Sequence, residues 1–226
     1  MNILHCFADT GAENPCLSRY GNVLRIGINA TDNKWSDAIK ADANDLPIRE
    51  NARFDVGWFH PPCGFVSPMS DTGNGSREDW PNLIPLARKI AQRHCDYWII
   101  ENKPSEYINE TVILDGHMFQ LGIEYQRAFE TNFPVDQPAK QSKLAETSPF
   151  FYTEKPGMWW ASVKGTDMGF SNQHIAKNTI PSAYIDYIMR NLSVAMDTKE
   201  RPDYSNYDME MAAKRSRINN HTIASF

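Results

Sequence analysis

Long apolar runs and paired cysteines are missing from this chain of 226 residues. No run of eighteen apolar residues occurs, so the sequence predicts no transmembrane helix and no membrane partner. The first residues lack a basic segment before an apolar one, so we expect no signal peptide. The four cysteines form no Cys-x-x-Cys pair and the six histidines are scattered singly. The sequence therefore predicts no metal site, and it favours reduced thiols in a cytoplasmic protein.

An excess of positive charge is also missing, because the formal net charge is −5. Proteins that bind duplex DNA gain much of their affinity by neutralising phosphates, usually with a basic patch. Arg88, Lys89 and Arg93 fall on one expected helix, and Lys140 and Lys143 on an expected loop. An ordinary solvated surface is the favoured interpretation of each group. The composition therefore counts mildly against tight, non-specific binding to DNA.

Apolar and aromatic residues are plentiful, at 41% and 12%, which is enough for a core in one domain with at most a small appendage. Apolar strand-like runs alternate with helical stretches. This alternation predicts an α/β fold, a Rossmann-like and mostly parallel sheet with helices on both faces. The expected strands cover residues 2–8, 22–29 and 97–100, together with the apolar run that ends at the Pro61–Pro62 pair.

Two amphipathic helices are expected. The first opens at Trp80 and Pro81 with Asp79 as its N-cap. Its apolar face comprises Leu83, Leu86, Ala87, Ile90 and Ala91. The second lies within residues 178–196, and its apolar face comprises Ile185, Ile188, Met189, Leu192, Ala195 and Met196.

A cysteine follows the double proline directly. Pro61 and Pro62 end the strand and stiffen the chain, and Gly64 permits a turn. Cys63 is therefore expected at the carboxyl end of a strand, where open α/β sheets bind ligands. A thiol held there is a candidate nucleophile. The alternative is a buried structural cysteine in a turn.

A second strand ends in polar residues, since residues 97–100 run into Glu101, Asn102 and Lys103. The two strand ends carry the motifs Pro-Pro-Cys-x-x-x-Ser, completed by Ser67, and Glu-Asn, with Lys103 where valine is usual. On these motifs the chain resembles the DNA cytosine-5 methyltransferase family.

A longer run strengthens this resemblance. Leu114, Gly116, Met118, Phe119 and Leu121 are similar to a Leu-x-Gly-x-Met-Phe-x-Leu core of a phage and actinobacterial branch of the family. Gln126 and Arg127 match a Gln-Arg pair of the wider family, although the second arginine usual there is replaced by Ala128 or Phe129. Asn178, Ile180 and Pro181 match the last motif, which returns to the cofactor site.

The resemblance implies a covalent mechanism on carbon 5 of a pyrimidine. Cys63 would add to carbon 6, Glu101 would bond N3 and the exocyclic amine, and Arg127 would hold O2. Asn102 would brace the Cys63 loop. In duplex DNA the target base would be flipped out of the stack. The implied setting is DNA modification in a bacterium or phage-infected host, including restriction–modification.

The resemblance also implies S-adenosyl-L-methionine as the methyl donor. The residues that it assigns to the donor site are Phe7, Asp9, Gly11, Asn29, Asp42, Pro61 and Asn178. Two of them depart from the family. Asp9 replaces the first glycine of the donor loop, where we expect its carboxylate to repel that of the methionine moiety. Asn29 replaces the acid that grips the ribose hydroxyls.

The expected organisation is a catalytic domain at 1–196 and a polar tail at 197–226. A short insert at about 135–165 stands in place of a full target-recognition domain. Its aromatic half either stacks on bases or forms a hairpin packed on the core. Residues 68–79 form either a closing lid or a plain surface loop.

Four functions remain open. The first is methylation of DNA with S-adenosylmethionine. The second is the same pyrimidine chemistry with a different donor or on a free nucleotide, motivated by intact Cys63, Glu101 and Arg127 beside an altered donor loop. The third is a catalytically silent DNA-binding or decoy relative, and the last is an unrelated α/β protein.

Overall fold

The computed structural model describes residues 1–67, 76–139, 153–167, 169 and 171–198. A seven-stranded sheet in the order β3-β2-β1-β4-β5-β7-β6 forms its centre. The strands are β1 (Asn2–Cys6), β2 (Asn22–Gly27), β3 (Asp37–Lys40), β4 (Phe54–Phe59), β5 (Cys95–Asn102), β6 (Val112–Leu114) and β7 (Arg127–Thr131).

The strands from β3 to β5 pair in parallel, and only β7 runs antiparallel to its neighbours β5 and β6. The chain builds outward from β1 to β3 and then returns to place β4 on the other side of β1. The strand order therefore reverses between β1 and β4, which is where open α/β sheets bind ligands. Because Cys6 pairs with Phe59, the segments that follow β1 and β4 leave the sheet side by side.

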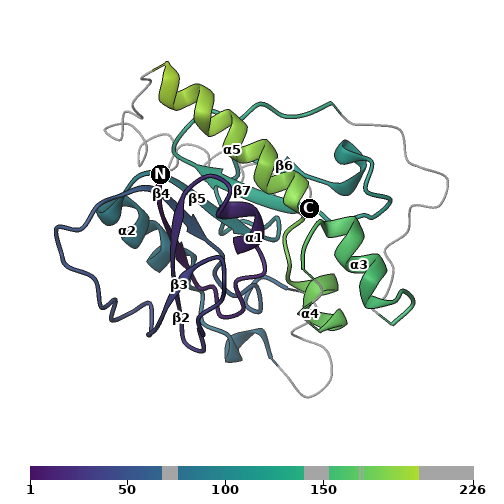
Figure 1. The fold of residues 1–226 in the computed structure, drawn as a ribbon, viewed down its shortest axis with the longest axis horizontal. Helices are drawn as coiled ribbons and strands as arrows, with labels where there is room; N and C mark the ends of the chain where they lie inside the picture. Colours follow the sequence, from purple (N-terminus) through teal and green to yellow (C-terminus); the bar gives the residue numbers. More distant parts are fainter. Residues whose placement is uncertain (68–75, 140–152, 168, 170, 199–226) are drawn as a thin grey trace, which may run out of the picture.

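Helices cover both faces of the sheet, as the sequence predicts. Ile3 and Trp58 pack with α1 (Asn14–Leu17) and α5 (Ser182–Asp197) on one face. Leu4 and Phe59 pack with α2 (Ile84–His94) on the other. Figure 1 shows α2 set apart from α1 and α5, with the strands between them. The alternation follows from strand geometry, because successive side chains point to opposite faces.

Strand β5 is longer than the expected run at 97–100. It includes Glu101, which pairs with Phe129, and Asn102, which pairs with Ala128. These polar residues are therefore the last two residues of a central strand rather than part of the loop beyond it, and both are buried. Their positions are fixed by backbone pairing on the β7 side.

The expected start of the first helix is wrong. A separate 3-10 turn covers Arg77–Asp79, and α2 begins only at Ile84. The side-chain oxygen of Asn82 accepts a hydrogen bond from the Ile84 N–H (3.2 Å), so the first N–H of the helix has a partner. Trp80 instead packs over Gly64, where an added Cβ would lie 2.3 Å from the indole ring. The predicted apolar face is otherwise found, with Ala87, Ile90 and Ala91 buried.

Helix α5 confirms the second expected helix. It begins after Pro181 and buries Ile185, Ile188, Met189, Leu192 and Ala195. Met196 is only partly buried. From residue 199 onward, the predicted tail lies outside the described residues.

Of the two alternatives for the aromatic half of the insert, a base-stacking surface and a packed hairpin, the hairpin is not found at 157–164, where the chain forms a helix. Helix α3 (Gly157–Lys164) follows Pro156 and ends at Gly165, whose φ of 63° suits a helix C-terminus. Its Trp160 packs against Ile123 and against Ile175 of α4 (Asn172–Lys177). Residues 140–152, with the aromatics Phe150 and Phe151, and residues 68–75 of the expected lid lie outside the described part. No helix in the described ranges has the length and apolarity to cross a bilayer.

Candidate active site

The Cys63 loop is tied to the neighbouring strand. The Asn102 side-chain amide donates to the Pro61 carbonyl (2.9 Å), and its oxygen accepts from the Lys103 N–H (2.8 Å). The loop then turns, since the Val66 N–H donates to the Cys63 carbonyl (3.2 Å). Cys63 is half-buried, whereas Cys6, Cys16 and Cys95 are buried, and all are free thiols.

A lysine stands beside this loop. Lys103 Nζ donates to Ser67 Oγ (2.7 Å), so it reaches from the end of β5 to the turn after Cys63. Burial lowers the pKa of Lys103, while attraction to Cys63 opposes this shift. The ammonium group therefore lies close enough to attract negative charge on the Cys63 sulfur.

Glu101 and Arg127 meet across the antiparallel pair β5–β7. Arg127 Nη1 lies 3.4 Å from Glu101 Oε1, and the two side chains are 2% and 0% exposed. The other terminal nitrogen of Arg127 donates to the Lys177 carbonyl (2.9 Å) and to the Tyr125 hydroxyl. Burial opposes the charge on Arg127, but Tyr125 and Glu101 raise its pKa overall. The guanidinium group is thus held charged and fixed.

Tyr125 is itself fixed by a buried lysine. Lys164 Nζ lies 3.4 Å from the centre of the Tyr125 ring and donates to the carbonyls of Ala176 (2.8 Å) and Thr179 (2.9 Å). Burial lowers the pKa of Lys164 well below its usual value. The sequence does not indicate that these two residues meet, because they belong to separate segments of the chain.

Two further residues that the sequence does not reveal complete the site. His60 Nε2 lies 3.2 Å from Glu101 Oε2, and His60 Nδ1 lies 3.7 Å from Glu13 Oε1. His60 directly precedes Pro61, which is the one local signal that could have drawn attention to it. Glu13 lies far away in the sequence, so only the fold brings it here.

Three atoms in this cluster lack a hydrogen-bond partner among the described residues. They are both carboxylate oxygens of Glu101 and Nη1 of Arg127, all buried. Native proteins rarely leave buried charged atoms without hydrogen bonds, and exceptions call for a partner such as a ligand or water. The arrangement therefore offers acceptors and a donor, side by side, to a polar ligand next to Cys63.

The loop after β1 is shaped by unusual backbone and by a buried arginine. Phe7 and Gly11 have φ values of 61° and 63°. Arg25 of β2 is fully buried and donates from Nη1 to the carbonyls of Ala8 (3.2 Å) and Asp9 (2.9 Å). An added Cβ at Gly11 would lie 2.8 Å from the same guanidinium group. Glycine is therefore required where loop and arginine meet.

Asp9 points toward the end of β2. Its Oδ1 accepts from the Asn29 N–H (2.9 Å) and would lie 2.4 Å from a Cβ placed on Gly27. A carboxylate thus stands beside position 29, where Asn29 replaces the acid that the sequence resemblance implies. Asp42 follows β3 at the same edge, and its Oδ1 accepts from the Asn44 N–H (2.8 Å). These exposed carboxylates fit the hydroxyl and amino groups of S-adenosylmethionine, because such groups donate hydrogen bonds.

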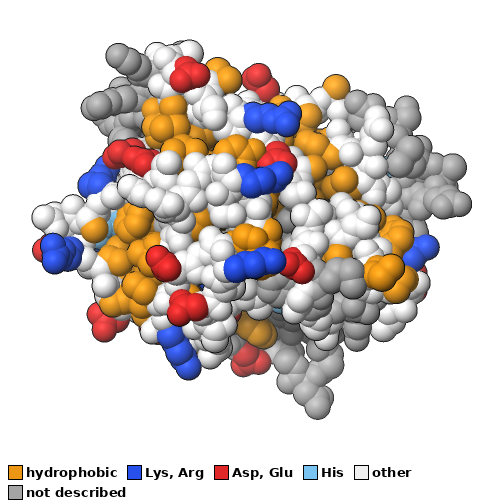
Figure 2. All heavy atoms as spheres, viewed as in Figure 1, with side chains coloured by type: hydrophobic (Ala, Val, Ile, Leu, Met, Phe, Trp, Pro, Cys, Tyr) orange, Lys and Arg blue, Asp and Glu red, His pale blue; other side chains and the backbone are white. Residues whose placement is uncertain are grey.

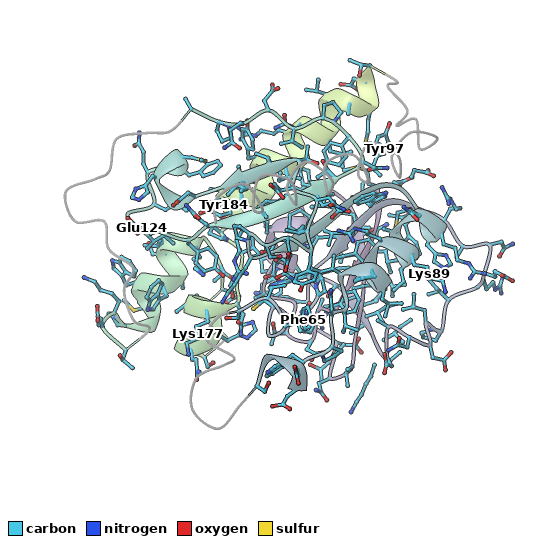
Figure 3. The ribbon with its side chains drawn as sticks, turned by 180° about the vertical axis from the view of Figure 1, so that it is seen from behind. Phe65, Lys89, Tyr97, Glu124, Lys177 and Tyr184 are labelled. Atoms are coloured by element: carbon cyan, nitrogen blue, oxygen red, sulfur yellow. The ribbon has the colours of Figure 1, made fainter. Side chains whose placement is uncertain are left out.

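The segment around α4 closes on the same loop. Thr10 Oγ1 lies 2.8 Å from His174 Nε2, and Glu13 Oε1 accepts from the Ile180 N–H (3.2 Å). Asn178 ends α4 and lies 3.5 Å from the other ring nitrogen of His174. In Figure 3, Phe65 and Lys177 lie in the lower half of the view and Tyr97 in the upper half. Because Asp9, Asn29, Asp42 and Cys63 follow β1, β2, β3 and β4, and Glu101 lies at the end of β5, the candidate residues gather at the carboxyl edge of the parallel strands.

No protein-family model and no curated protein matches the chain. A prophage-encoded E. coli protein assigned as a DNA modification methyltransferase is similar in structure, with 13% identity and a TM-score of 0.44 over 64% of this chain. The alignment spans 52%, about half, of that protein's own length. An S-adenosylmethionine-dependent methyltransferase from Mesorhizobium loti aligns with 12% identity and a TM-score of 0.32, over 50% of this chain and 51% of that one. The plantazolicin methyltransferase BpumL with bound SAH aligns with 14% identity and a TM-score of 0.33, over 46% and 39%. These likenesses concern the fold alone.

Proposed function

We propose that this chain is a methyltransferase that modifies carbon 5 of a pyrimidine in DNA through a covalent adduct on Cys63, with S-adenosylmethionine as donor. The observation that carries the proposal is the convergence of Cys63, Glu101 and Arg127, which lie far apart in the sequence. The unpartnered atoms of Glu101 and Arg127 supply the hydrogen-bonding pattern that a pyrimidine edge needs. The sequence resemblance assigns the same roles to the same residues.

Each residue has a distinct task in this chemistry. Carbon 5 of cytosine is too electron-poor to attack a methyl donor, and a thiolate added at carbon 6 makes it nucleophilic. Cys63 supplies the thiolate, with the Lys103 ammonium group beside it. Glu101 bonds N3, where electrons accumulate, and Arg127 bonds O2. Asn102 holds the loop so that the sulfur cannot drift.

The donor site is proposed at the carboxyl edge of β1, β2 and β3. Asp9, Asn29 and Asp42 would bind the nucleoside part of S-adenosylmethionine, and the loop from Phe7 to Gly11, with Pro61 and Asn178, would line its other side. When bound, this cofactor supplies an electrophilic methyl group. The Asp9 carboxylate takes the place of the acid that the family carries at position 29.

Nucleoside mass spectrometry on DNA from cells that express the chain tests the proposal. The expected result is 5-methylcytosine that disappears in Cys63→Ala and in Glu101→Gln but persists in Cys16→Ala, which removes a buried thiol elsewhere. A Cys63-dependent product of another mass would show that the donor is not S-adenosylmethionine, and this part of the proposal would be replaced. No new product on any DNA would contradict the proposal.

A free pyrimidine nucleotide is the second candidate substrate. The described part of the insert contains one short helix, α3, in which Trp160 and Ala161 are buried and Met158 is exposed. So short an insert offers little surface for reading a duplex sequence. Release of deuterium from carbon 5 of deoxycytidine monophosphate, but not of DNA oligonucleotides, would favour this candidate. A silent relative would release deuterium from neither.

A further inference from the structure

Four side chains of alternating charge form a row through the site. Glu13, at the start of α1, faces His60 after β4, His60 faces Glu101 of β5, and Glu101 faces Arg127 of β7. The three separations are 3.7, 3.2 and 3.4 Å, and no side chain in the row is more than 16% exposed. The row therefore joins four separate elements, and His60 is its centre.

His60 is the titratable cation of this row. Burial disfavours its charge, but the carboxylates of Glu101 and Glu13 outweigh burial and Arg127, so its pKa is raised. Two other histidines face the cluster, His5 from β1 and His174 from α4. Burial lowers the pKa of both, to about 4 for His5. Of the three histidines, His60 is therefore the one whose surroundings favour the protonated form, and its Nε2 is the nitrogen that lies 3.2 Å from Glu101.

We propose that His60 is a positioning residue that holds the proton which Glu101 delivers to the pyrimidine, and that Glu13 keeps His60 protonated. This inference rests on the proposed function, because it concerns the proton that the Cys63 adduct requires. Without His60, Glu101 would face only Arg127, which cannot release a proton at ordinary pH. His60 can supply the proton that Arg127 cannot release.

The proton and the electrons balance in one step. The Cys63 sulfur forms a bond to carbon 6, the C5–C6 π pair moves to the C4–C5 bond, and the C4–N3 π pair takes a proton at N3. That proton passes from Nε2 of His60 through the Glu101 carboxylate to N3, so that Glu101 ends the step as the carboxylate it was at the start. His60 becomes neutral and remains between the carboxylates of Glu13 and Glu101. Collapse of the adduct reverses the path and returns the proton to His60.

Two measurements test this role. The first is NMR titration of the His60 ring in full-length protein labelled with ¹³C/¹⁵N-histidine. The His60 signal is assigned as the one that is missing from the spectrum of His60→Gln. The second is the pH profile, from about pH 5.5 to 9.5, of deuterium release from carbon 5 of cytosine in DNA oligonucleotides and in deoxycytidine monophosphate. Release reports adduct formation without any methyl donor. Glu13→Gln tests whether Glu13 favours protonation of His60. As a control, His94→Gln removes a buried histidine on α2.

We expect release by the wild type to fall at alkaline pH with the same midpoint as the His60 titration. Glu13→Gln should move both midpoints down by about one pH unit, because it removes one of two carboxylates beside His60. His60→Gln should abolish the alkaline fall and slow release at neutral pH about tenfold. His94→Gln should change neither profile.

The outcomes separate the two proposals. Cys63-dependent release whose pH profile is unmoved by Glu13→Gln would overturn the role of His60 and leave the proposed function standing. No release from any substrate would overturn the proposed function and this inference with it. If His60→Gln fails to fold, the Glu13→Gln comparison alone decides, since it preserves the shape of the side chain.

Discussion

At the scale of single residues, the four cysteines of this chain occupy two kinds of surroundings. Burial raises the pKa of the Cys16 and Cys95 thiols to about 12, and that of Cys6 lies well above its usual value. Cys63 alone among them is partly exposed, and it lies near the Lys103 ammonium group. Thiol reactivity depends on access and on the thiolate fraction.

Iodoacetamide at neutral pH should therefore alkylate Cys63 at least about tenfold faster than any other cysteine, because the reagent reacts with thiolates. Peptide mass spectrometry after timed quenching measures the four rates. Lys103→Met should slow alkylation of Cys63, whereas Lys89→Met, on α2, should not. Equal rates at Cys63 and Cys16 would argue against a reactive thiol here.

The Glu13 carboxyl group should give the protein acid sensitivity. Burial would raise its pKa, but the hydrogen bond and charge of His60 outweigh burial and lower the pKa from 4.5 to about 2. A depressed folded pKa stabilises the fold above the unfolded value and loses that effect as pH falls through the folded value. Glu13 thus contributes stability that declines between about pH 4.5 and pH 2.

Glu13→Gln should lower the free energy of unfolding at pH 6 by about 3 kcal/mol, and this difference should shrink as the pH falls toward 3. Urea unfolding at several pH values measures it. Glu50→Gln, at a side chain that is 81% exposed, should have little effect at any pH. A constant penalty for Glu13→Gln would show that packing rather than charge stabilises this position.

At the scale of elements, the donor loop depends on close approach between β1 and β2. The Asp9 carboxylate occupies the space beside Gly27 and is hydrogen-bonded to the Asn29 N–H. Any side chain at position 27 would displace it. The strand pair and the loop therefore place one carboxylate at the proposed ribose site.

Asp9→Ala should weaken binding of S-adenosylhomocysteine about tenfold, since a hydrogen bond to a charged group is worth about 1.5–3 kcal/mol. Gly27→Ala should have a similar effect by pushing Asp9 aside. Isothermal titration calorimetry measures both, and Asp37→Ala at the start of β3 is the control. Unchanged affinity in both variants would remove Asp9 from the donor site.

At the scale of the whole molecule, charge is dispersed. Figure 2 shows lysine and arginine side chains separated from one another, with acidic side chains among them, on the face displayed. Several cations are already paired, for example Arg53 with Asp96 and Arg88 with Glu130. Together with the net charge of −5, this distribution predicts few phosphate contacts at a time.

Binding to duplex DNA should accordingly depend weakly on salt. Each neutralised phosphate contributes about −0.9 to the slope of log K against log salt, so we expect a slope shallower than about −3. Fluorescence anisotropy at salt concentrations from about 50 to about 300 mM measures this slope. A slope steeper than about −5 would reveal a phosphate-binding surface that the charge distribution does not predict.

Local pattern determined much of this protein. Alternating apolar runs predict the central strands and both main helices, and the Pro61–Pro62–Cys63 and Glu101–Asn102 motifs identify two strand ends that lie together at one edge. Predictions from these features are confirmed because strand burial and proline geometry depend on only a few neighbouring residues. The expected start of the first helix at Trp80 is wrong, and Trp80 instead packs over Gly64, a contact between segments separated in sequence.

Tertiary structure alone decided how the site is charged. Glu13, His60, Glu101 and Arg127 come from four elements, and no spacing in the sequence relates Glu13 to His60. The direction of the Asp9 side chain also depends on Gly27 of the neighbouring strand. Local sequence sets which residues end a strand, whereas the electrostatic surroundings of a buried group are set by whatever the fold packs against it.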